Sequence, residues 1–235
     1  MSYKTELHCH TKEASACGKE LPEYVVERYL DAGYTSLVLT NHINAATFTS
    51  KRYAEYLEER GVADCWSTKI DFYVRDYDRM LEASKGRLNV ILGLELRLVC
   101  DSFNDYLIYG VTEEWLRNSE CFMSIKIEEL SDYVRKSGLL IYQAHPFRNG
   151  MTVVDPTLLD GYEVYNGNIG HDSRNPIAEA WAKRYNKLGI SGSDFHRAVH
   201  QTNSGIITDS PITSNEELLN VLRSQNYQII KASEK

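Results

Sequence analysis

Several features common in other protein classes are missing from this sequence of 235 residues. It has no run of about 18 apolar residues, so no segment is predicted to span a membrane. Its five cysteines form no C-x-x-C pair, which argues against a disulfide framework and a structural zinc knuckle: Cys9, Cys17, Cys65, Cys100 and Cys121. No G-x-G-x-x-G follows the first apolar run, so a dinucleotide-binding fold lacks its usual signature.

Internal repeats, low-complexity tracts and Pro/Gly-rich linkers are also absent, so we expect residues 1–235 to form a single domain. The segment from Met1 to Glu6 lacks the apolar core of a signal peptide, which predicts a cytoplasmic protein. The net charge of −7 disfavours nucleic acid as a partner, although a local cationic centre could still bind an anion. The composition carries no signal for oligomeric state.

Short apolar runs alternate with amphipathic stretches along the chain. We expect strands over residues 5–9, 36–40, 89–94, 106–109, 138–144, 161–165, 190–193, 205–208 and 227–230. Helices are expected over residues 22–32, 51–60, 71–84, 127–136, 176–188 and 214–224. This alternation predicts an α/β protein with a mostly parallel sheet, and about seven such units favour a closed barrel over an open doubly wound sheet.

Histidine and acidic side chains lie at the ends of these expected strands. Most of them follow a strand directly, and one opens a strand: His8, His10, His42, Glu95, Asp105, His145, Asp194 and His196. The carboxyl ends of parallel barrel strands open on one face, so these distant residues are expected to meet in space. Imidazole with carboxylate is the ligand set of zinc, manganese or iron, and this number of ligands predicts two or three divalent ions.

The His8-Cys9-His10 segment has the right phase for a shared site. Residues i and i+2 of a strand face the same way, so the two imidazoles point together and Cys9 points into the core. Each candidate ligand alone has an ordinary explanation, such as a hydrogen-bonded histidine or a helix cap. Their shared placement at strand ends favours the metal interpretation.

These segments resemble the motifs of the polymerase and histidinol phosphatase (PHP) family. The matches occur in family order and extend from Glu6 to about Thr208: Glu6–Thr11, Thr40–His42, Gly93–Glu95, Ala144–Pro146 and Gly192–His196. The resemblance implies a distorted, TIM-like (β/α) barrel of seven strands, two or three metal ions and phosphoester hydrolysis. It implies metal ligands at His8, His10, His42, Glu95, His145, Asp194 and His196. Glu95 and Asp194 would then bridge or cap the first ions, and His42 and His196 would belong to a third.

Three positions depart from the family pattern. Asn41 stands where the family usually has Asp, which is expected to change hydrogen bonding around the ligands more than metal binding itself. Cys17 stands before Gly18 where a histidine or acidic residue is usual, so a Cys17 thiolate or the nearby Glu13 could complete the third site, or that site is weak. Asp105 stands where a histidine is common, as a carboxylate substitute.

The expected reaction is hydrolysis of a small phosphorylated metabolite by a metal-bound hydroxide, with no phosphoenzyme intermediate. We assign the catalytic roles to Asp194 and His196. Arg148, three residues after His145, is expected to bind a phosphate oxygen of the substrate.

Four further residues have no firm role. Glu163 and Asn166 lie at the end of an expected strand and could orient ligands or line the pocket. His171 and His200 are expected to be peripheral, although either could touch substrate. Two other functions remain open: an amidohydrolase-like C–N or ester hydrolase, and a catalytically silent metal-binding module. The acidic charge disfavours a nuclease.

Overall fold

The computed structural model describes residues 2–101, 103–119 and 122–232. Its strands are β1 (Tyr3–Cys9), β2 (Ser36–Leu39), β3 (His42–Ile43), β4 (Asn89–Leu92), β5 (Leu94–Leu96), β6 (Tyr106–Tyr109), β7 (Leu140–Gln143), β8 (Gly161–Asn166), β9 (Leu188–Gly192), β10 (Gly205–Thr208) and β11 (Gln228–Ile230). Its helices are α1 (Pro22–Asp31), α2 (Ala45–Phe48), α3 (Lys51–Arg60), α4 (Trp66–Ser84), α5 (Glu113–Arg117), α6 (Ile127–Lys136), α7 (Asn175–Arg184) and α8 (Asn215–Ser224), with a 3-10 turn at Pro156–Leu158.

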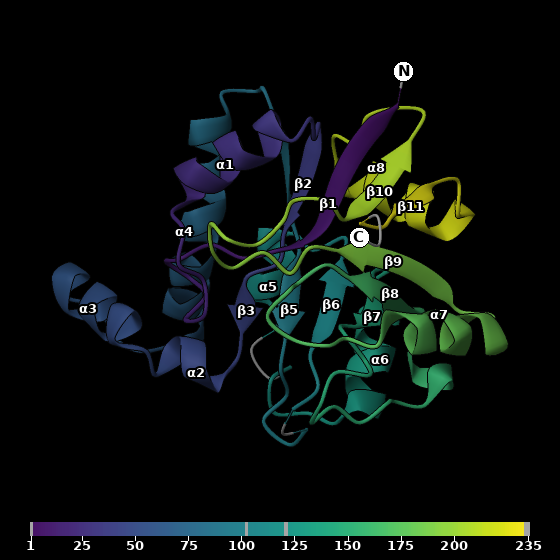
Figure 1. Ribbon diagram of the computed structural model, residues 1–235. Coiled ribbons are helices and arrows are strands. Elements are labelled where there is room, and N and C mark those ends of the chain that lie inside the picture. The colour runs from purple at the N-terminus through teal and green to yellow at the C-terminus, as the bar shows by residue number, and fades with distance from the viewer. Residues whose placement is uncertain (1, 102, 120–121, 233–235) are drawn as a thin grey trace.

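The α/β class is confirmed, but within the described residues the strands form two sheets and no closed barrel of seven repeated units. One sheet has five strands in the order β11-β10-β1-β2-β4, and the other has six in the order β3-β5-β6-β7-β8-β9 (Figure 1). The sheets approach each other at the end of β1, where Cys9 forms a parallel bridge with Phe195 and the amide of His10 donates to the Phe195 carbonyl at 3.0 Å.

The expectation of a mostly parallel arrangement is wrong around β6. This strand pairs antiparallel with both β5 and β7, and β10 pairs antiparallel with both β1 and β11. Within the described part of the β5–β6 connection no helix is formed, and a short connection without a helix suits an antiparallel pair. As a result, β6 begins at the edge where its neighbours end, with Tyr106 opposite Leu96 and Gln143.

A hydrophobic core lies between the two sheets and is formed by side chains from both of them. Leu7 and Val38 from the first sheet share a cluster with Leu107 and Tyr142 from the second, all fully buried. Leu218 and Leu222 place one face of α8 in the same cluster. On the outer side of the first sheet, α1 and α4 lie side by side against β2 (Figure 1) and bury a separate apolar cluster.

Most expected elements are found within a few residues of their expected bounds. The largest shift is in α4, which begins at Trp66 rather than at residue 71. The expected strand 89–94 is divided at Gly93, where a Cβ atom would lie 2.7 Å from Val38 Cγ1. The described cysteines, at positions 9, 17, 65 and 100, are free thiols, and Cys121 lies outside the described residues. Among the described helices, none has the length and apolarity needed to cross a bilayer.

Candidate metal centre

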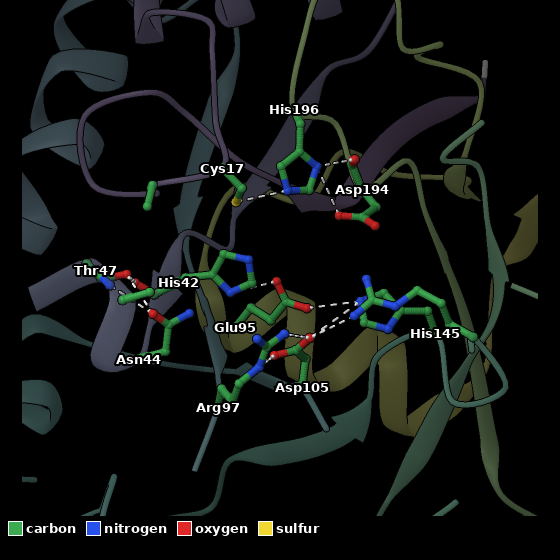
Figure 2. A pocket seen from close by; sticks show the side chains of 13 residues that line it. Cys17, His42, Asn44, Thr47, Glu95, Arg97, Asp105, His145, Asp194 and His196 are labelled. Atoms are coloured by element: carbon green, nitrogen blue, oxygen red, sulfur yellow. Dashed lines mark hydrogen bonds and ion pairs between the residues drawn. The ribbon is translucent and has the colours of Figure 1, made fainter. Parts of the chain in front are cut away.

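The structure brings the predicted ligand residues into one connected cluster at the rim formed by the ends of β1, β3, β5, β7 and β9. Figure 2 shows Glu95 in the middle of this cluster, between the rings of His42 and His145. Asp194 and His196 lie on one side of Glu95, and Asp105 lies on the other. Because β6 runs antiparallel to its neighbours, a residue that precedes this strand reaches the same rim as residues that follow the others.

Glu95 is surrounded by imidazole nitrogens. Its Oε2 lies 3.3 Å from His8 Nε2, 3.2 Å from His10 Nε2 and 3.1 Å from His42 Nδ1. Its Oε1 lies 3.3 Å from His145 Nε2. The Glu95 side chain is almost completely buried, so these contacts occur away from bulk water. One carboxylate therefore connects all four imidazoles.

Asp194 forms the second carboxylate of the cluster. Its Oδ1 lies 3.5 Å from His8 Nε2, 3.4 Å from His10 Nε2 and 3.3 Å from His196 Nδ1. Its Oδ2 faces the other way and lies 3.1 Å from His171 Nε2. His8 and His10 therefore lie between two carboxylates from distant parts of the chain, Glu95 and Asp194.

The facing atoms of this cluster are close but form no hydrogen bonds. Both oxygens of Glu95, Nε2 of His8, Nε2 of His10 and Nδ1 of His42 are buried and without a hydrogen-bond partner. A buried polar atom without a partner costs about 1–3 kcal/mol, so several around one point are unusual in a folded protein. Cations coordinated at this point would satisfy these atoms together. The donor set therefore fits divalent metal ions.

Partners behind the cluster fix the orientation of two of the histidines. His8 Nδ1 donates to Glu163 Oε1 at 2.9 Å, which leaves the lone pair of Nε2 directed at Glu95 and Asp194. The other Glu163 oxygen accepts the backbone amide of His145 at 2.8 Å. A carboxylate that holds the far nitrogen of a histidine is typical of metal sites, because it fixes the tautomer and raises ligand basicity.

Replacing Glu163 with Gln is expected to weaken metal binding by about 10–100-fold, because His8 loses the charge that fixes its tautomer. Metal affinity can be measured by competition with a chromophoric chelator. Glu216, exposed on α8, provides the matched control when it is changed to Gln. If E163Q and E216Q bind metal with equal affinity, Glu163 has no positioning role.

Asn41 positions the loop that follows β1. Its Oδ1 accepts the Thr11 amide at 2.8 Å and the Ser15 hydroxyl at 3.0 Å. Since the Ser15 hydrogen is donated to Asn41, the Ser15 oxygen accepts the His42 amide at 2.8 Å and faces His10 Nδ1 at 3.4 Å. The expectation that Asn41 affects the surroundings of the ligands therefore has a structural basis in this chain of contacts.

A buried carboxylate explains why an amide suits position 41. Asp76 Oδ2 accepts from the Thr11 hydroxyl at 2.5 Å and from the amide of Ala14 at 2.9 Å. The Asn41 amide nitrogen lies 3.3 Å from the same oxygen and donates to it. An aspartate at position 41 would place a second buried carboxylate against Asp76, whose own pKa is already raised by burial.

The backbone is constrained where ligands leave their strands. His145 and Asp194 have φ of 29° and 49°, in the left-handed region that non-glycine residues rarely adopt. Such conformations cost about 1–3 kcal/mol and cluster at functional sites. Gly192, two residues before Asp194, permits the approach of β1, since a Cβ atom there would lie 2.2 Å from the Cβ of His8.

The loop after β1 places Cys17, and not Glu13, beside the cluster. Glu13 points away from the cluster, toward Arg75 at 3.1 Å. Cys17 points toward it, with Sγ 3.1 Å from His196 Nε2 (Figure 2). Burial, followed by the charges of Glu95 and Asp194, raises the pKa of the thiol to about 12.

Asp105 lies at the rim but is engaged by two arginines. Arg97 donates to both of its oxygens, at 2.7 and 2.6 Å (Figure 2), and Arg148 donates to Oδ2 at 3.4 Å. The same Oδ2 lies 3.9 Å from His145 Nε2. A ligand role for Asp105 therefore stays a prediction, and its observed contacts fix the two arginines beside the cluster.

Two adjoining hollows open above the cluster, with volumes of about 250 Å³ and about 520 Å³. Cys17, Arg148, Asp194 and His196 line both of them. The smaller hollow reaches Glu95 and His145, and the larger extends over the segments that carry His171 and His200. A substrate could therefore place one group at the cluster and the remainder beside it.

The histidines of the cluster differ in charge. Burial lowers the pKa of His196 to about 4, so this imidazole is neutral at neutral pH. Burial also opposes the charged form of His8, but the carboxylates of Glu163, Glu95 and Asp194 outweigh it and raise its pKa well above the usual value. In the metal-free protein, protons therefore compensate part of the negative charge that metal ions would compensate.

The two carboxylates are held in their charged forms. Burial alone would raise the pKa of Glu95, but the imidazoles around it, with His42 and His8 foremost, keep it well below the usual range. The pKa of Asp194 is likewise held well below its usual value against burial, by His8 and His196. Both side chains can therefore act as anionic ligands without losing a proton.

Several residues of the site were not found by sequence reasoning. The expectation that His171 is peripheral is wrong, since its Nε2 contacts Asp194, while His200 Nδ1 accepts the amide of His196 at 3.2 Å. Asn168 donates to Asp194 Oδ2 at 3.2 Å, as Asn166 does at 3.3 Å. Of these two asparagines only Asn166 carried a signal in the sequence, because it directly follows the expected strand 161–165.

No family model matches the sequence, and no curated protein matches it significantly. Solved structures do match. A proposed metal-dependent phosphoesterase from Bifidobacterium adolescentis aligns with a TM-score of 0.55 at 15% identity, over 94% of this chain and 96% of that one. An amidohydrolase from Chromobacterium violaceum with bound sulfate aligns with a TM-score of 0.53 at 14% identity, over 99% of this chain and 100% of that one.

The lesion-specific endonuclease EndoQ from Pyrococcus furiosus aligns with a TM-score of 0.59 at 13% identity, over 97% of this chain. This chain spans 58% of the EndoQ chain. At such identities the likeness concerns the fold, and it agrees with the motifs found in the sequence. The chain therefore has the PHP-like fold that those motifs predict.

Proposed function

We propose that this protein is a metal-dependent phosphoesterase that hydrolyses a small phosphorylated metabolite. The observation that carries the proposal is the group of buried, unpartnered imidazole and carboxylate atoms around Glu95, beside a hollow lined by arginine. Ligands for cations and side chains for an anion thus occur together in a chain whose net charge is −7. The PHP-like fold supports the same class of reaction.

The residues that would hold two divalent ions are those whose nitrogen and oxygen atoms converge on the centre: His8, His10, Glu95, His145 and Asp194. Zinc, manganese and iron suit this donor set. Bound there, such ions lower the pKa of coordinated water and neutralise charge on the phosphoryl oxygens.

The catalytic roles proposed for Asp194 and His196 follow from their position. Both line the hollows, and Asp194 keeps its negative charge despite burial. Asp194 would accept the proton of the attacking water through Oδ1. His196 Nδ1 lies 3.3 Å from that oxygen and donates to the Asp194 backbone carbonyl at 2.7 Å, which would hold the backbone of Asp194 in place.

The two arginines of the rim have different roles. Arg97 forms both of its short contacts with Asp105, which fixes it as part of the wall. Arg148 has one longer contact with Asp105 and lines both hollows, so its remaining donors can reach a bound anion. We assign phosphate recognition to Arg148.

Changing Arg148 to Ala is expected to lower kcat/KM by about 10–100-fold, the size of a lost charge-assisted hydrogen bond. Metal content should stay the same, since the guanidinium contacts only Asp105 within the cluster. Steady-state kinetics with a phosphomonoester, together with elemental analysis, measures both quantities. Arg184→Ala, on the exposed side of α7, is the control, and equal kinetics for the two variants would remove Arg148 from substrate binding.

The proposed reaction is tested by a substrate screen on protein loaded with manganese, zinc or iron. The panel contains p-nitrophenyl phosphate, its diester, nucleotides, phosphorylated sugars, a short oligonucleotide and a set of amides. Hydrolysis of phosphomonoesters that stops on chelation supports the proposal. Cleavage of amides alone would favour the C–N hydrolase, and metal-dependent stabilisation without turnover would favour a silent module.

One observation weighs against the C–N hydrolase. Barrels of the amidohydrolase type usually carry a carboxylated lysine at the metals, and among the described residues no lysine lines either hollow. The cationic side chains there are arginines, which match phosphate better than a neutral amide.

A further inference from the structure

A second group of ligand atoms lies beside the Glu95 cluster and contains sulfur. One ligand atom from each of its four residues falls within 4.8 Å of the others: His10, Cys17, His42 and His196. The 3.1 Å between Cys17 Sγ and His196 Nε2 is close to the separation of two ligands of one tetrahedral ion, given metal–nitrogen distances of about 2.0–2.1 Å and metal–sulfur distances of about 2.3 Å. A thiol in place of carboxylates distinguishes this group chemically from its neighbour.

Two backbone hydrogen bonds hold the loop that carries Cys17. The Gly18 amide donates to the Ser15 carbonyl at 3.2 Å, and a Cβ at Gly18 would lie 2.2 Å from the Thr11 carbonyl oxygen. The next amide, that of Lys19, donates to the His196 carbonyl at 2.7 Å. The backbone thus holds Cys17 against His196, so their contact is not the product of a free loop.

His196 presents a lone pair to the sulfur. Its Nδ1 lies 2.7 Å from the backbone carbonyl of Asp194, which can only accept, so Nδ1 carries the hydrogen. In a neutral imidazole the other nitrogen, Nε2, is then the ligand atom, and it lies 3.1 Å from Cys17 Sγ.

The remaining two histidines contribute unpartnered nitrogens. His10 is fully buried and its Nε2 has no hydrogen-bond partner, and the same holds for Nδ1 of the partly exposed His42. The His10 ring lies 4.3 Å from that of His196 and 4.6 Å from that of His42, measured between centroids. His10 therefore lies at the boundary between the sulfur-containing group and the Glu95 cluster.

We propose that Cys17, His42 and His196 form a thiolate-containing site for one divalent ion of the borderline-soft class, such as Zn²⁺, Fe²⁺ or Co²⁺. A thiolate ligand favours these ions over Mn²⁺ and Mg²⁺, which prefer oxygen. The inference deepens the proposed function, because it names the metal class of one site in the proposed centre. The two sites adjoin at His10, and His42 and His196 also contact Glu95 and Asp194.

The test is a Co²⁺ titration of metal-free protein in which Cys65, Cys100 and Cys121 are replaced by Ser, so that Cys17 and the buried Cys9 are the remaining thiols. We expect a near-ultraviolet sulfur-to-cobalt charge-transfer band that saturates at about one equivalent per chain. Adding Cys17→Ser should abolish this band and leave the visible cobalt bands of the other site. A band that survives C17S, or its absence from cobalt-loaded parent protein, overturns the proposal.

Cys17→His provides a second variant that keeps a ligand at this position. It should retain cobalt binding without the charge-transfer band and raise the affinity for Mn²⁺ relative to Zn²⁺ by about tenfold. An unchanged ratio of affinities would contradict a thiolate ligand in the parent protein.

The charge-transfer band and phosphoester turnover, measured on the same cobalt-loaded protein, distinguish the proposed thiolate site from the proposed phosphoesterase activity. A charge-transfer band in protein that hydrolyses no phosphoester would support the thiolate site and refute the phosphoesterase. Phosphoester hydrolysis by cobalt-loaded protein that lacks the charge-transfer band would support the phosphoesterase and refute the thiolate site.

Discussion

Replacing Glu95 with Gln is expected to lower kcat/KM for a phosphomonoester by about a thousandfold or more. Glu95 is the only carboxylate within the described cluster that contacts His8, His10, His42 and His145 together. Glutamine keeps the shape of the side chain but removes the charge and presents an amide nitrogen to the centre. Two ions held by this group would then lose their common anionic ligand.

Controls must show that the loss of kcat/KM in E95Q arises at the site and not from unfolding of the protein. Glu59→Gln, on the exposed face of α3, has the same chemical change and should retain full activity. Far-ultraviolet circular dichroism at the assay temperature shows whether E95Q is folded, and elemental analysis shows how much metal it retains. A folded E95Q protein with normal turnover would mean that Glu95 is not part of the catalytic centre.

Removing metal with a chelator should lower Tm by about 5–10 °C relative to protein with metal at about 100 times Kd. Binding at that concentration contributes about 2.7 kcal/mol, and a chain of this length shifts by about 2–4 °C per kcal/mol. The physical reason is that metal ions satisfy the buried atoms of His8, His10 and Glu95 that have no hydrogen-bond partner. Differential scanning calorimetry measures the shift.

The same shift should shrink as the pH falls. Metal binds the unprotonated imidazole, and the pKa values of His8 and His10 are raised, by carboxylates that outweigh the opposing effect of burial. Protons therefore compete at these two residues from near-neutral pH downward, and metal uptake releases them. Calorimetric titration in buffers of different ionisation enthalpy counts the released protons. A Tm shift that is independent of pH, or that persists in E95Q, would place the stabilising ion elsewhere.

The part of the site that could be predicted from the sequence is the set of residues that close or follow expected strands. His8, His145 and Asp194 were predicted to converge because catalytic groups gather where parallel strands end, and hydrophobic patterning shows where strands end. Spacing in the His8-Cys9-His10 segment also predicted that Cys9 would be buried away from the cluster, as it is.

Other parts of the site depend on tertiary contacts that no local pattern records. Asp105 precedes its strand and reaches the rim because β6 runs antiparallel, and the direction of a strand leaves no mark in its composition. Asp76 lies within a helix and acts through a loop 62 residues away in sequence, at Ala14. The Asn41 amide donates to Asp76, which explains why an amide suits the position where the family usually has an aspartate.

The division of the strands into two sheets also could not be foreseen. Apolar runs such as residues 138–144 show that a strand is buried, but not which neighbour it pairs with. In the structure β7 lies between an antiparallel and a parallel partner, and β1 forms a parallel bridge at Cys9 with Phe195, beyond the end of β9.

The central claim is that His8, His10, Glu95, His145 and Asp194 bind metal ions together. Anomalous diffraction from crystals of manganese- or zinc-loaded protein, recorded on either side of the metal absorption edge, tests it most directly. Anomalous peaks in coordination contact with Glu95 and with imidazole nitrogens on both sides of it are predicted. Loaded crystals with peaks only at surface residues, and none at Glu95, would contradict the account.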